Sequence, residues 1–386
     1  MKGTMMFPHR TTTRSRRTRL AAAAVAFSFL TLAGCSGVVA EGGSGGSDES
    51  FEFTLSTAAQ PGTPNAAVQD WYLDRIEEET DGRIAFERTA PEAICKAAEV
   101  VECVRDGRAQ IGVTVPDYTP QYFPSASMVS IPFLSQNSAA IMRSLYDIHA
   151  DYEPAMEVMA DNGLHHVGTW PVGRLLLGTP EPVTEKSGLS GLQMRASGPI
   201  VQQVLSGAGV NIQAITAPET YEAVQRGVIN SIGGAIDFPV NYKLMELLPY
   251  WTDPGFGQYS TFGMWFSADA YDGLPEDLKG IVDDVTEELN TGEGIEAFNT
   301  QAADQCQQML DASTVEEFTA WEDSATEEWS TEVEDSTQQQ WIELVKGQGL
   351  SDAEGVLDEY LSHLEEYDDL EYTDATLDCE DQFAAR

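Results

Sequence analysis

The stretch that decides the fold is Leu189-Ser-Gly-Leu-Gln-Met-Arg-Ala-Ser-Gly-Pro-Ile-Val-Gln-Gln-Val-Leu-Ser-Gly-Ala-Gly209. Its short apolar run at 192–196 predicts a strand. Residues 199–208 predict a helix that begins with a proline, which suits the first helical position, and ends before Gly209, a residue typical of helix ends.

The same alternation continues on both sides of this stretch. Residues 211–215 predict a further strand, and residues 218–226 predict a helix that Gly227 closes. Upstream, strands are expected at 165–170 and 174–179. Alternating strands and helices build a parallel or mixed sheet covered by helices, so the fold class is α/β.

The N-terminal part of the body repeats the pattern. Residues 51–55, 83–88 and 110–115 read as strands, a helix is expected over 66–80 until Asp81-Gly82, and another helix runs to Arg105. Two such units in about 300 residues suggest two α/β domains.

The first 34 residues have the pattern of a signal peptide. Six Lys and Arg residues precede the short apolar run 20–32, which is followed by Leu32-Ala-Gly-Cys35. This motif resembles a bacterial lipobox, so Cys35 is the expected lipidation site. The alternative is an uncleaved anchor with a chance cysteine, but the run is shorter than the roughly 20 residues of a spanning helix. Ser15-Arg16-Arg17 is compatible with twin-arginine export, and Sec export stays open.

The charge balance restricts the partners of the mature chain. Loss of the leader leaves 15 Lys and Arg against 63 Asp and Glu, a net charge of −48. Nucleic-acid binding is excluded because phosphate affinity comes from clustered basic residues. Residues 35–50 are rich in Gly and Ser and predict a flexible, lipidated tether.

The four cysteines after Cys35 predict two disulfides in an exported chain, with three possible pairings. Proximity in sequence favours Cys95–Cys103 together with Cys306–Cys379. Eight residues of continuous helix span about 12 Å, which exceeds the Cα separation of about 7 Å that a disulfide allows. The first pair therefore requires Cys95 to lie in a loop that folds back on the helix.

The last 76 residues are helical and acidic in pattern, with 24 Asp and Glu against two Lys and Arg. Trp321, Trp329 and Trp341 argue for helices packed on the body by an aromatic face. Residues 346–386 form an acidic C-terminal extension, whose end from Tyr367 is expected to be irregular and pinned by Cys379.

Catalytic and metal-binding patterns are missing from the sequence. It has no Gly-x-Ser-x-Gly, His-Glu-x-x-His or Gly-rich phosphate motif, and no paired Cys or His spacing typical of zinc. His165 and His166 would point to opposite faces of a strand. No catalytic residue, metal or cofactor is therefore predicted.

Two arginines are the candidate site residues. Arg174 and Arg195 each lie in or beside an apolar strand, where a guanidinium needs a partner. Its planar fork matches a carboxylate with two parallel hydrogen bonds. A structural ion pair with one of the many acidic residues is the competing interpretation for both.

Several segments in order resemble one family, the TRAP transporter solute-binding proteins of the DctP type. The resemblance covers about residues 51–345, and its segments are Glu79-Thr-Asp-Gly-Arg-Ile84, Cys103-Val-Arg-Asp-Gly-Arg-Ala-Gln-Ile-Gly-Val113, Ser130-Ile-Pro-Phe-Leu134, Leu189-Ser-Gly-Leu-Gln-Met-Arg195, Gly207-Ala-Gly209, Ala217-Pro-Glu-Thr-Tyr-Glu-Ala-Val-Gln-Arg-Gly-Val-Ile229 and Leu274-Pro-Glu-Asp-Leu278.

The resemblance implies a two-domain periplasmic-binding-protein-like clamp with hinge strands and bridging helices. Residues 51–171 with about 261–300 would form domain I, and residues 172–260 with about 301–345 domain II. The ligand would be a small organic acid bound in the cleft and delivered to TRAP permease membrane subunits. An ABC-importer receptor and a lipid-anchored hydrolase are the alternatives.

By motif position, Arg195 would pair with the carboxylate of the ligand, and Arg174 matches a second ligand-facing arginine. Tyr221 and Glu222 fall in the family's helix after a strand. Three aromatic residues just after strands are further lining candidates, with core packing as the alternative: Tyr118, Trp170 and Phe238.

The segment after this helix departs from the family pattern. The family commonly has Gly-Val-Val-Asp-Gly-Gln-Glu, whereas this chain has Gly227-Val-Ile-Asn-Ser-Ile-Gly233. Asp237 and Asn241, which follow, are expected to contact other groups of the ligand. The specificity of sialic-acid or C4-dicarboxylate receptors is therefore not expected to transfer.

Overall fold

The computed structural model describes residues 49–134 and 136–386. The predicted signal peptide, Cys35 and nearly all of the predicted tether lie outside the described residues. Within the described part of the chain, no helix is both long enough and apolar enough to span a bilayer.

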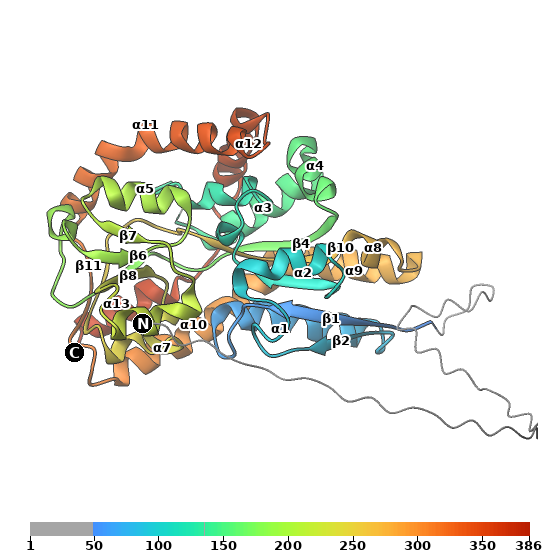
Figure 1. The fold of residues 1–386 in the computed structure, drawn as a ribbon, viewed down its shortest axis with the longest axis horizontal. Coiled ribbons are helices and arrows are strands. Elements are labelled where there is room, and N and C mark those ends of the chain that lie inside the picture. Colours follow the sequence, from blue (N-terminus) through green and yellow to red (C-terminus); the bar gives the residue numbers. More distant parts are fainter. Residues whose placement is uncertain (1–48, 135) are drawn as a thin grey trace, which may run out of the picture. The chain divides into compact units, whose positions relative to one another are not determined.

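The first sheet has five strands in the order β2-β1-β3-β10-β4 (Figure 1). The strands β1 and β2 are parallel, as are β1 and β3, whereas β10 runs antiparallel to β3 and β4. Their bounds are β1 Phe51–Thr57, β2 Ile84–Arg88, β3 Ile111–Thr114, β4 Leu164–Pro171 and β10 Thr261–Ser267. This sheet and the helices packed on it are called the first lobe.

The second sheet has six strands in the order β11-β9-β5-β8-β6-β7. The strand β6 is parallel to both β7 and β8, and β5 is antiparallel to β8 and β9. The bounds are β5 Leu176–Thr179, β6 Gln193–Arg195, β7 Asn211–Gln213, β8 Ser231–Gly234, β9 Tyr250–Asp253 and β11 Glu317–Ala320. This sheet and its helices are the second lobe.

The chain crosses between the lobes twice through short connections. It leaves the first sheet after β4, enters the second at β5, and returns from β9 to β10. Helix α10 (Gly294–Asp311) packs against α1 of the first lobe and α7 of the second. The α/β clamp with connecting strands and a bridging helix is therefore confirmed.

The helices cover these sheets. Their bounds are α1 Pro64–Glu79, α2 Val100–Arg105, α3 Ser138–Asp151, α4 Glu153–Asp161, α5 Pro199–Gly207, α6 Thr220–Gln225, α7 Asp237–Val240, α8 Ala268–Asp272, α9 Glu276–Glu288, α11 Asp323–Gly347, α12 Ala353–Glu366 and α13 Ala375–Ala384. Short 3-10 helices are η1 Ala97–Glu99, η2 Pro116–Tyr118, η3 Ser125–Ser130, η4 Lys186–Leu189, η5 Ala217–Glu219 and η6 Leu244–Glu246, and a π-turn, η7, spans Leu289–Glu293.

Local sequence explains where these elements begin and end. The Thr63 hydroxyl accepts a hydrogen bond from the Ala66 amide at 3.1 Å, and Pro64 opens α1. The chain leaves α1 through Asp81 and Gly82, both with positive φ, as the Asp-Gly stop signal predicts.

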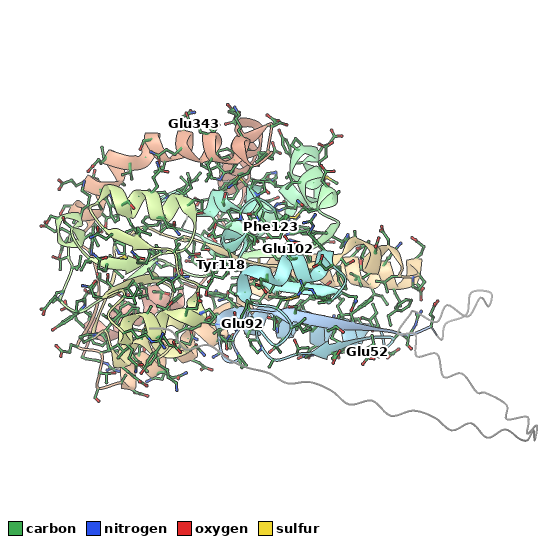
Figure 2. The ribbon with its side chains drawn as sticks, in the orientation of Figure 1. Glu52, Glu92, Glu102, Tyr118, Phe123 and Glu343 are labelled. Atoms are coloured by element: carbon green, nitrogen blue, oxygen red, sulfur yellow. A yellow bond between two sulfur atoms is a disulfide. The ribbon has the colours of Figure 1, made fainter. Side chains whose placement is uncertain are left out.

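The acidic C-terminal part folds onto the body. Trp321, Trp329 and Trp341 are 5%, 1% and 0% exposed, so the aromatic residues face inward as expected. Exposed carboxylates such as Glu52 and Glu343 lie on the surface (Figure 2). The expectation of an irregular end from Tyr367 is wrong for residues 375–384, which form α13 because Asp374 caps the helix by accepting from the Thr376 amide.

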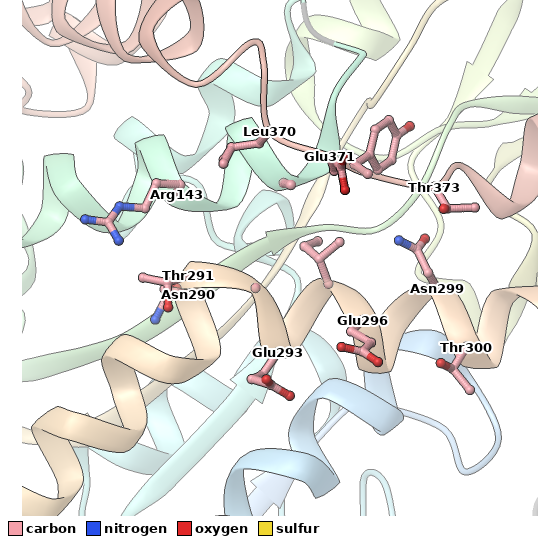
Figure 3. A pocket seen from close by; sticks show the side chains of 14 residues that line it. Arg143, Asn290, Thr291, Glu293, Glu296, Asn299, Thr300, Leu370, Glu371 and Thr373 are labelled. Carbon is pink, nitrogen blue, oxygen red and sulfur yellow. The ribbon is translucent and has the colours of Figure 1, made fainter.

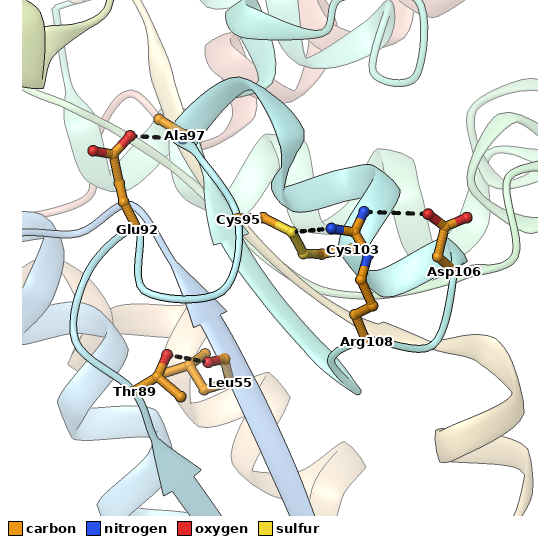
Figure 4. Close-up of a disulfide and its surroundings, with 8 residues drawn as sticks. All are labelled: Leu55, Thr89, Glu92, Cys95, Ala97, Cys103, Asp106 and Arg108. Atoms are coloured by element: carbon orange, nitrogen blue, oxygen red, sulfur yellow. Dashed lines mark hydrogen bonds and ion pairs between the residues drawn. A yellow bond between two sulfur atoms is a disulfide. The ribbon is translucent and has the colours of Figure 1, made fainter. Parts of the chain in front are cut away.

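Both cysteine pairs favoured by proximity are bonded in the structure. Cys95 lies in a loop, not in α2, so its Cα is 6.4 Å from that of Cys103 (Figure 4). Glu92, with φ of 58°, accepts from the Ala97 amide at 2.9 Å and turns the loop back. Cys306 in α10 is bonded to Cys379 in α13, with a Cα separation of 5.4 Å.

Candidate functional site

A buried cavity lies between the two lobes, beside both connections. It measures about 20 Å³, which is room for a single water. The first lobe contributes Ala58, Asn65, Ala97, Val115, Tyr118 and Phe262; the second lobe contributes Arg195, Ser197, Ala217, Pro218, Asp237, Phe238 and Tyr242; the connections contribute Val172, Tyr259 and Ser260.

Arg195, at the end of β6, is the charged centre of this cavity. Its Nε donates to the Ile215 carbonyl at 2.9 Å, and its Nη1 donates to the Gly233 carbonyl at 2.9 Å. The side chain is only 1% exposed. Two carbonyls at the ends of neighbouring strands thus hold the guanidinium plane in one orientation.

The positive charge of Arg195 has no carboxylate partner in the part of the chain that the structure describes. No Asp or Glu oxygen there lies within the 4.0 Å of an ion pair. A buried, unpaired guanidinium is unfavourable unless an anion approaches it. The geometry therefore favours an anionic ligand at this position.

Tyr118 connects the arginine to the first lobe. It follows β3 in the single turn η2 (Figure 2). Its hydroxyl accepts from Arg195 Nη2 at 3.4 Å and from the Ala217 amide at 3.0 Å. One hydroxyl of the first lobe therefore contacts two groups of the second lobe at the cavity.

Asp237 begins α7, directly beyond β8, and lines the same cavity. It is 6% exposed, and its Oδ1 has no hydrogen-bond partner. Burial raises the pKa of this carboxyl to about 7, although Arg195 acts in the opposite direction. The hydroxyl of Ser197, also on the cavity wall, has no partner either.

Asp117 lies behind the cavity wall. Its Oδ2 accepts from the Ser260 hydroxyl at 2.5 Å, and its Oδ1 has no partner. Burial raises the pKa of this carboxyl to about 6. A Cβ at Gly198, whose φ is 76°, would lie 2.9 Å from the Asp117 carboxyl, so only glycine fits there.

Aromatic rings complete the walls. The Arg195 guanidinium lies 4.7 Å from the centroid of the Phe238 ring, and Phe238 in turn contacts Tyr242 with a centroid distance of 5.0 Å. Tyr259 is 2% exposed and interacts with Arg195. Such rings provide both apolar contact and a surface that attracts cations.

The structure does not bring Arg174 to this cavity. Its Nε donates to Asp253 Oδ2 at 2.5 Å, and its Nη1 donates to Gln136 Oε1 at 2.7 Å and lies 3.5 Å from Asp374. The side chain is 8% exposed. Arg174 thus takes part in a buried ion-pair network, which was the competing interpretation.

Four other residues named from the sequence also lie outside the cavity. Trp170 is fully buried and donates to Asn65 Oδ1 at 3.1 Å, so it supports a cavity residue without lining the cavity. The Tyr221 hydroxyl donates to Glu246 at 3.2 Å. The Asn241 amide donates to the Pro61 carbonyl at 3.3 Å and links the lobes outside the cavity. Glu222 pairs with Arg226 at 2.9 Å on the surface.

Sequence reasoning missed Asp117, Ser197, Tyr242, Tyr259 and Ser260. Asp117 precedes Tyr118 at the end of a buried strand, which was an available signal. Tyr259 and Ser260 lie in the connection from β9 to β10, which carries no motif. These two residues reach the cavity only because the chain returns to the first lobe at this point.

Within the ranges that the structure describes, neither metal-binding groups nor histidine rings are gathered in this cavity. Among the described residues, no group of three or more His, Cys, Asp or Glu is arranged to hold a metal. Burial lowers the pKa of His149 to about 4 and that of His166 well below its usual value. Neither ring lines the cavity.

A larger pocket of about 670 Å³ lies where the π-turn η7 meets α3 and residues 370–373 (Figure 3). Its carboxylates, on Glu293, Glu296 and Glu371, are exposed to water. Its arginine, Arg143, already pairs with Asp147 at 3.1 Å. None of the predicted ligand-binding residues lines this pocket, and it lacks the unpaired buried charge of the cavity at Arg195.

The two lobes, the short connections and the buried arginine between them define a solute-binding clamp. Residues 55–344 match the family model of bacterial extracellular solute-binding proteins, family 7, also called DctP. The chain therefore belongs to this family, whose members are solute-binding proteins of TRAP transporters.

Two relatives are periplasmic proteins named for the binding of ectoine. The ectoine-binding periplasmic protein TeaA of Halomonas elongata is 22% identical over 62% of this chain and 71% of its own length. The ectoine/5-hydroxyectoine-binding periplasmic protein UehA of Ruegeria pomeroyi is 25% identical over 65% of this chain and 77% of its own length.

Solved structures share the fold. A TRAP solute-binding protein from Bordetella bronchiseptica with bound mandelate has a TM-score of 0.71 and 23% identity, covering 82% of this chain and 99% of that one. A protein from Rhodoferax ferrireducens with copurified benzoate has a TM-score of 0.75 and 19% identity, covering 83% and 99%.

Proposed function

We propose that this protein is an extracytoplasmic receptor that binds a small carboxylate in the cavity at Arg195 and delivers it to a TRAP permease. One observation carries the proposal. Arg195 is a guanidinium that is 1% exposed, is held by two carbonyls, and has no carboxylate partner among the described residues.

The carboxylate of the ligand would supply the missing counter-charge. A guanidinium has five N–H groups, and three of those of Arg195 go to Ile215, Gly233 and Tyr118. At most two N–H groups remain for a carboxylate, and the Tyr259 side chain also bonds to this guanidinium. Charge-assisted bonds of this kind are about twice as strong as neutral ones.

Binding requires the lobes to separate. The cavity of about 20 Å³ holds one water and no organic acid. Because the lobes are joined by short connections, an opening motion would admit the ligand and closure would return Tyr118 to Arg195. Ligand release to membrane subunits would use the same motion, so no bond in the ligand needs to change.

The relatives support this chemistry. The two solved structures with mandelate and benzoate each contain a ligand that carries one carboxylate. The resemblance of the motifs around Arg195 to those of the family supports this residue as the one that pairs with such a group.

The direct test compares acids with their neutral amides. Mandelate and benzoate are added to the purified protein beside mandelamide and benzamide, and the melting temperature is measured. Linkage at 100 times the dissociation constant stabilises the fold by about 2.7 kcal/mol, so a bound acid raises the melting temperature and its amide does not. Stabilisation by amides or cations alone would contradict the proposal.

We further propose that lipid on Cys35 anchors the receptor at the outer face of the cell membrane. The motif Leu32-Ala-Gly-Cys35 and the Gly/Ser-rich segment after it support this anchor. A tether keeps a receptor at high local concentration beside its permease. Replacement of Cys35 by Ala should move the protein from the membrane fraction to the soluble fraction; retention in the membrane would argue against lipidation.

A further inference from the structure

The cavity at Arg195 has two carboxyl groups in or behind its walls, which the binding of a plain carboxylate does not require. Of the described residues on its walls, Arg195 is the one with a positive side chain. Asp237 lies on the wall and Asp117 directly behind it, and both interact electrostatically with Arg195. Burial raises the pKa of Asp117 to about 6 and that of Asp237 to about 7, so the formal charge of the group reaches −1 above about pH 7.

This charge balance discriminates between classes of ligand. A plain monocarboxylate would bring a second negative charge into a group that is already negative, and a dicarboxylate would bring a third. Like charges at close range in a buried site are unfavourable. A ligand that carries its own positive group beside the carboxylate adds no net charge.

Asp237 is placed to receive such a positive group. Its Oδ1 is without a hydrogen-bond partner, although the residue is only 6% exposed and lies on the cavity wall. A buried acceptor without a donor is unfavourable by about 1–3 kcal/mol, so a donor on the ligand would relieve it. An N–H of a cationic nitrogen is the strongest such donor.

The aromatic walls fit the same group. Phe238 lies against Arg195 and contacts Tyr242. Tyr118, Phe238 and Tyr242 line the same cavity as Asp237. Faces of aromatic rings attract a desolvated cation by about 2 kcal/mol. The wall near Asp237 therefore combines a carboxyl with rings, which is a common arrangement for a protonated nitrogen.

We infer that the ligand is a zwitterion, whose carboxylate pairs with Arg195 and whose protonated nitrogen binds Asp237. The inference rests on the proposed function, because it takes the carboxylate at Arg195 as given. The pKa of Asp237, raised to about 7 by burial, agrees with a carboxyl that lacks a counter-ion in the free protein.

Matched pairs of probes test this inference. L-Proline is compared with cyclopentanecarboxylate, and L-pipecolate with cyclohexanecarboxylate, by titration calorimetry on the full mature chain. The members of a pair differ only by a protonated nitrogen in place of a ring carbon. The zwitterion is expected to bind at least about tenfold more tightly than its partner, which corresponds to about 1.4 kcal/mol.

Asp237→Asn provides the second arm. Asparagine keeps the shape but not the charge, so the variant should lose the preference for the zwitterion while its affinity for the plain acid is retained or improved. Glu222→Gln, an exposed acid outside the cavity, is the control and should leave both affinities unchanged.

The outcomes separate the inference from the proposed function. Equal or tighter binding of the plain acid in both pairs overturns the zwitterion and leaves the carboxylate receptor intact. An Asp237→Asn variant that keeps the preference for the zwitterion overturns the role of Asp237. Failure of both probe pairs, together with mandelate and benzoate, overturns the inference and the proposed function alike.

Discussion

Arg195 and Arg174 look alike in the sequence and have different surroundings in the structure. Each lies at an apolar strand, and a structural ion pair was an open interpretation for both. Arg174 forms such ion pairs with Asp253 and Asp374, which are 79 and 200 residues away in sequence. No local pattern contains partners at that distance, which is why motif position alone could not separate the two arginines.

Tyr118 and Phe238, predicted because each follows a strand, line the cavity with Arg195, and so does Asp237, predicted from the unusual segment after Gly233. Trp170, expected by the same rule, lies inside β4 and packs in the core. The difference is the direction of the side chain, which depends on the register of β4 and cannot be read from the position of a strand end.

The raised pKa of Asp237 predicts a pH effect on stability. The folded protein holds this proton up to about pH 7, whereas the unfolded chain releases it near pH 4. Because the folded state binds more protons in this window, this residue lowers stability as pH rises from about 4 to 7. The free energy of unfolding of Asp237→Asn relative to wild type should therefore increase over this window and level off above it.

Urea unfolding of both proteins at pH 5, 6, 7 and 8 measures this difference. Comparison at each pH removes the contributions of the buried histidines, His149 and His166, which titrate in both proteins. A difference that is the same at pH 5 and pH 8 would show that Asp237 is ionised throughout.

At the scale of elements, the local signals were informative. Helix α5 was expected at 199–208 and occupies 199–207, and the strands before and after it are in place. The ends of α5 could be predicted because Pro and Gly determine where a helix begins and ends through their own backbone dihedral angles. From the sequence, the loop that carries Cys95 could be predicted only as a requirement of the Cys95–Cys103 disulfide. Its turn depends on Glu92 and on contacts with β1, which no local pattern contains.

The turn between β6 and α5 contains Gly198, which packs against Asp117 behind the wall of the Arg195 cavity. Gly198 has φ of 76° and leaves room for the Asp117 carboxyl. Gly198→Ala should destabilise the protein by at least about 1 kcal/mol, because the new Cβ meets both a strained backbone and a carboxyl group. The control is Gly280→Ala in α9, where a Cβ meets nothing within 4 Å and a helix interior favours alanine.

Thermal or urea unfolding of the two variants decides the comparison. The expected order of stability is Gly280→Ala, wild type, Gly198→Ala. A Gly198→Ala protein as stable as wild type would mean that Asp117 can move away freely.

At the scale of the whole molecule, the C-terminal part contacts both lobes. Helix α11 packs on α5 of the second lobe, and α12 packs on α3 of the first (Figure 1). Asn137 donates to the Leu370 carbonyl at 3.0 Å, and Asp374 reaches Arg174. Residues 345–386 lie beyond the family match, so neither the motifs nor the resemblance predicted how this extension packs.

Glu380 makes the packing of this extension sensitive to pH. It is 7% exposed, and burial beside Asp253 raises its pKa to about 9. The folded protein keeps this proton between about pH 4.5 and 9, whereas the unfolded chain does not, so stability falls as pH rises through this range. The slope that one such proton contributes is at most about 1.4 kcal/mol per pH unit.

Glu380→Gln should remove this contribution. Urea unfolding between pH 7 and 9 should show a declining stability for wild type and a flatter profile for the variant, with the variant more stable at pH 9. Parallel profiles would mean that Glu380 is not the group that titrates.

The bond between Cys306 and Cys379 closes a loop of 73 residues and joins α13 to α10. The chain-entropy model gives about 4 kcal/mol for such a loop and about 2.5 kcal/mol for the eight-residue Cys95–Cys103 loop. Replacement of Cys306 and Cys379 by Ser should therefore lower the free energy of unfolding more than the same change at Cys95 and Cys103. The opposite order in urea unfolding would contradict this ranking.

The central claim is that Arg195 holds the carboxylate of the ligand, and titration calorimetry of Arg195→Ala tests it most directly. The acid that binds wild type most tightly is titrated into this variant and into Arg226→Ala, whose arginine lies on the surface of the same lobe. Circular dichroism confirms that both variants are folded. We expect at least a hundredfold loss of affinity in Arg195→Ala and none in Arg226→Ala, whereas an unchanged affinity in a folded Arg195→Ala protein would contradict the claim.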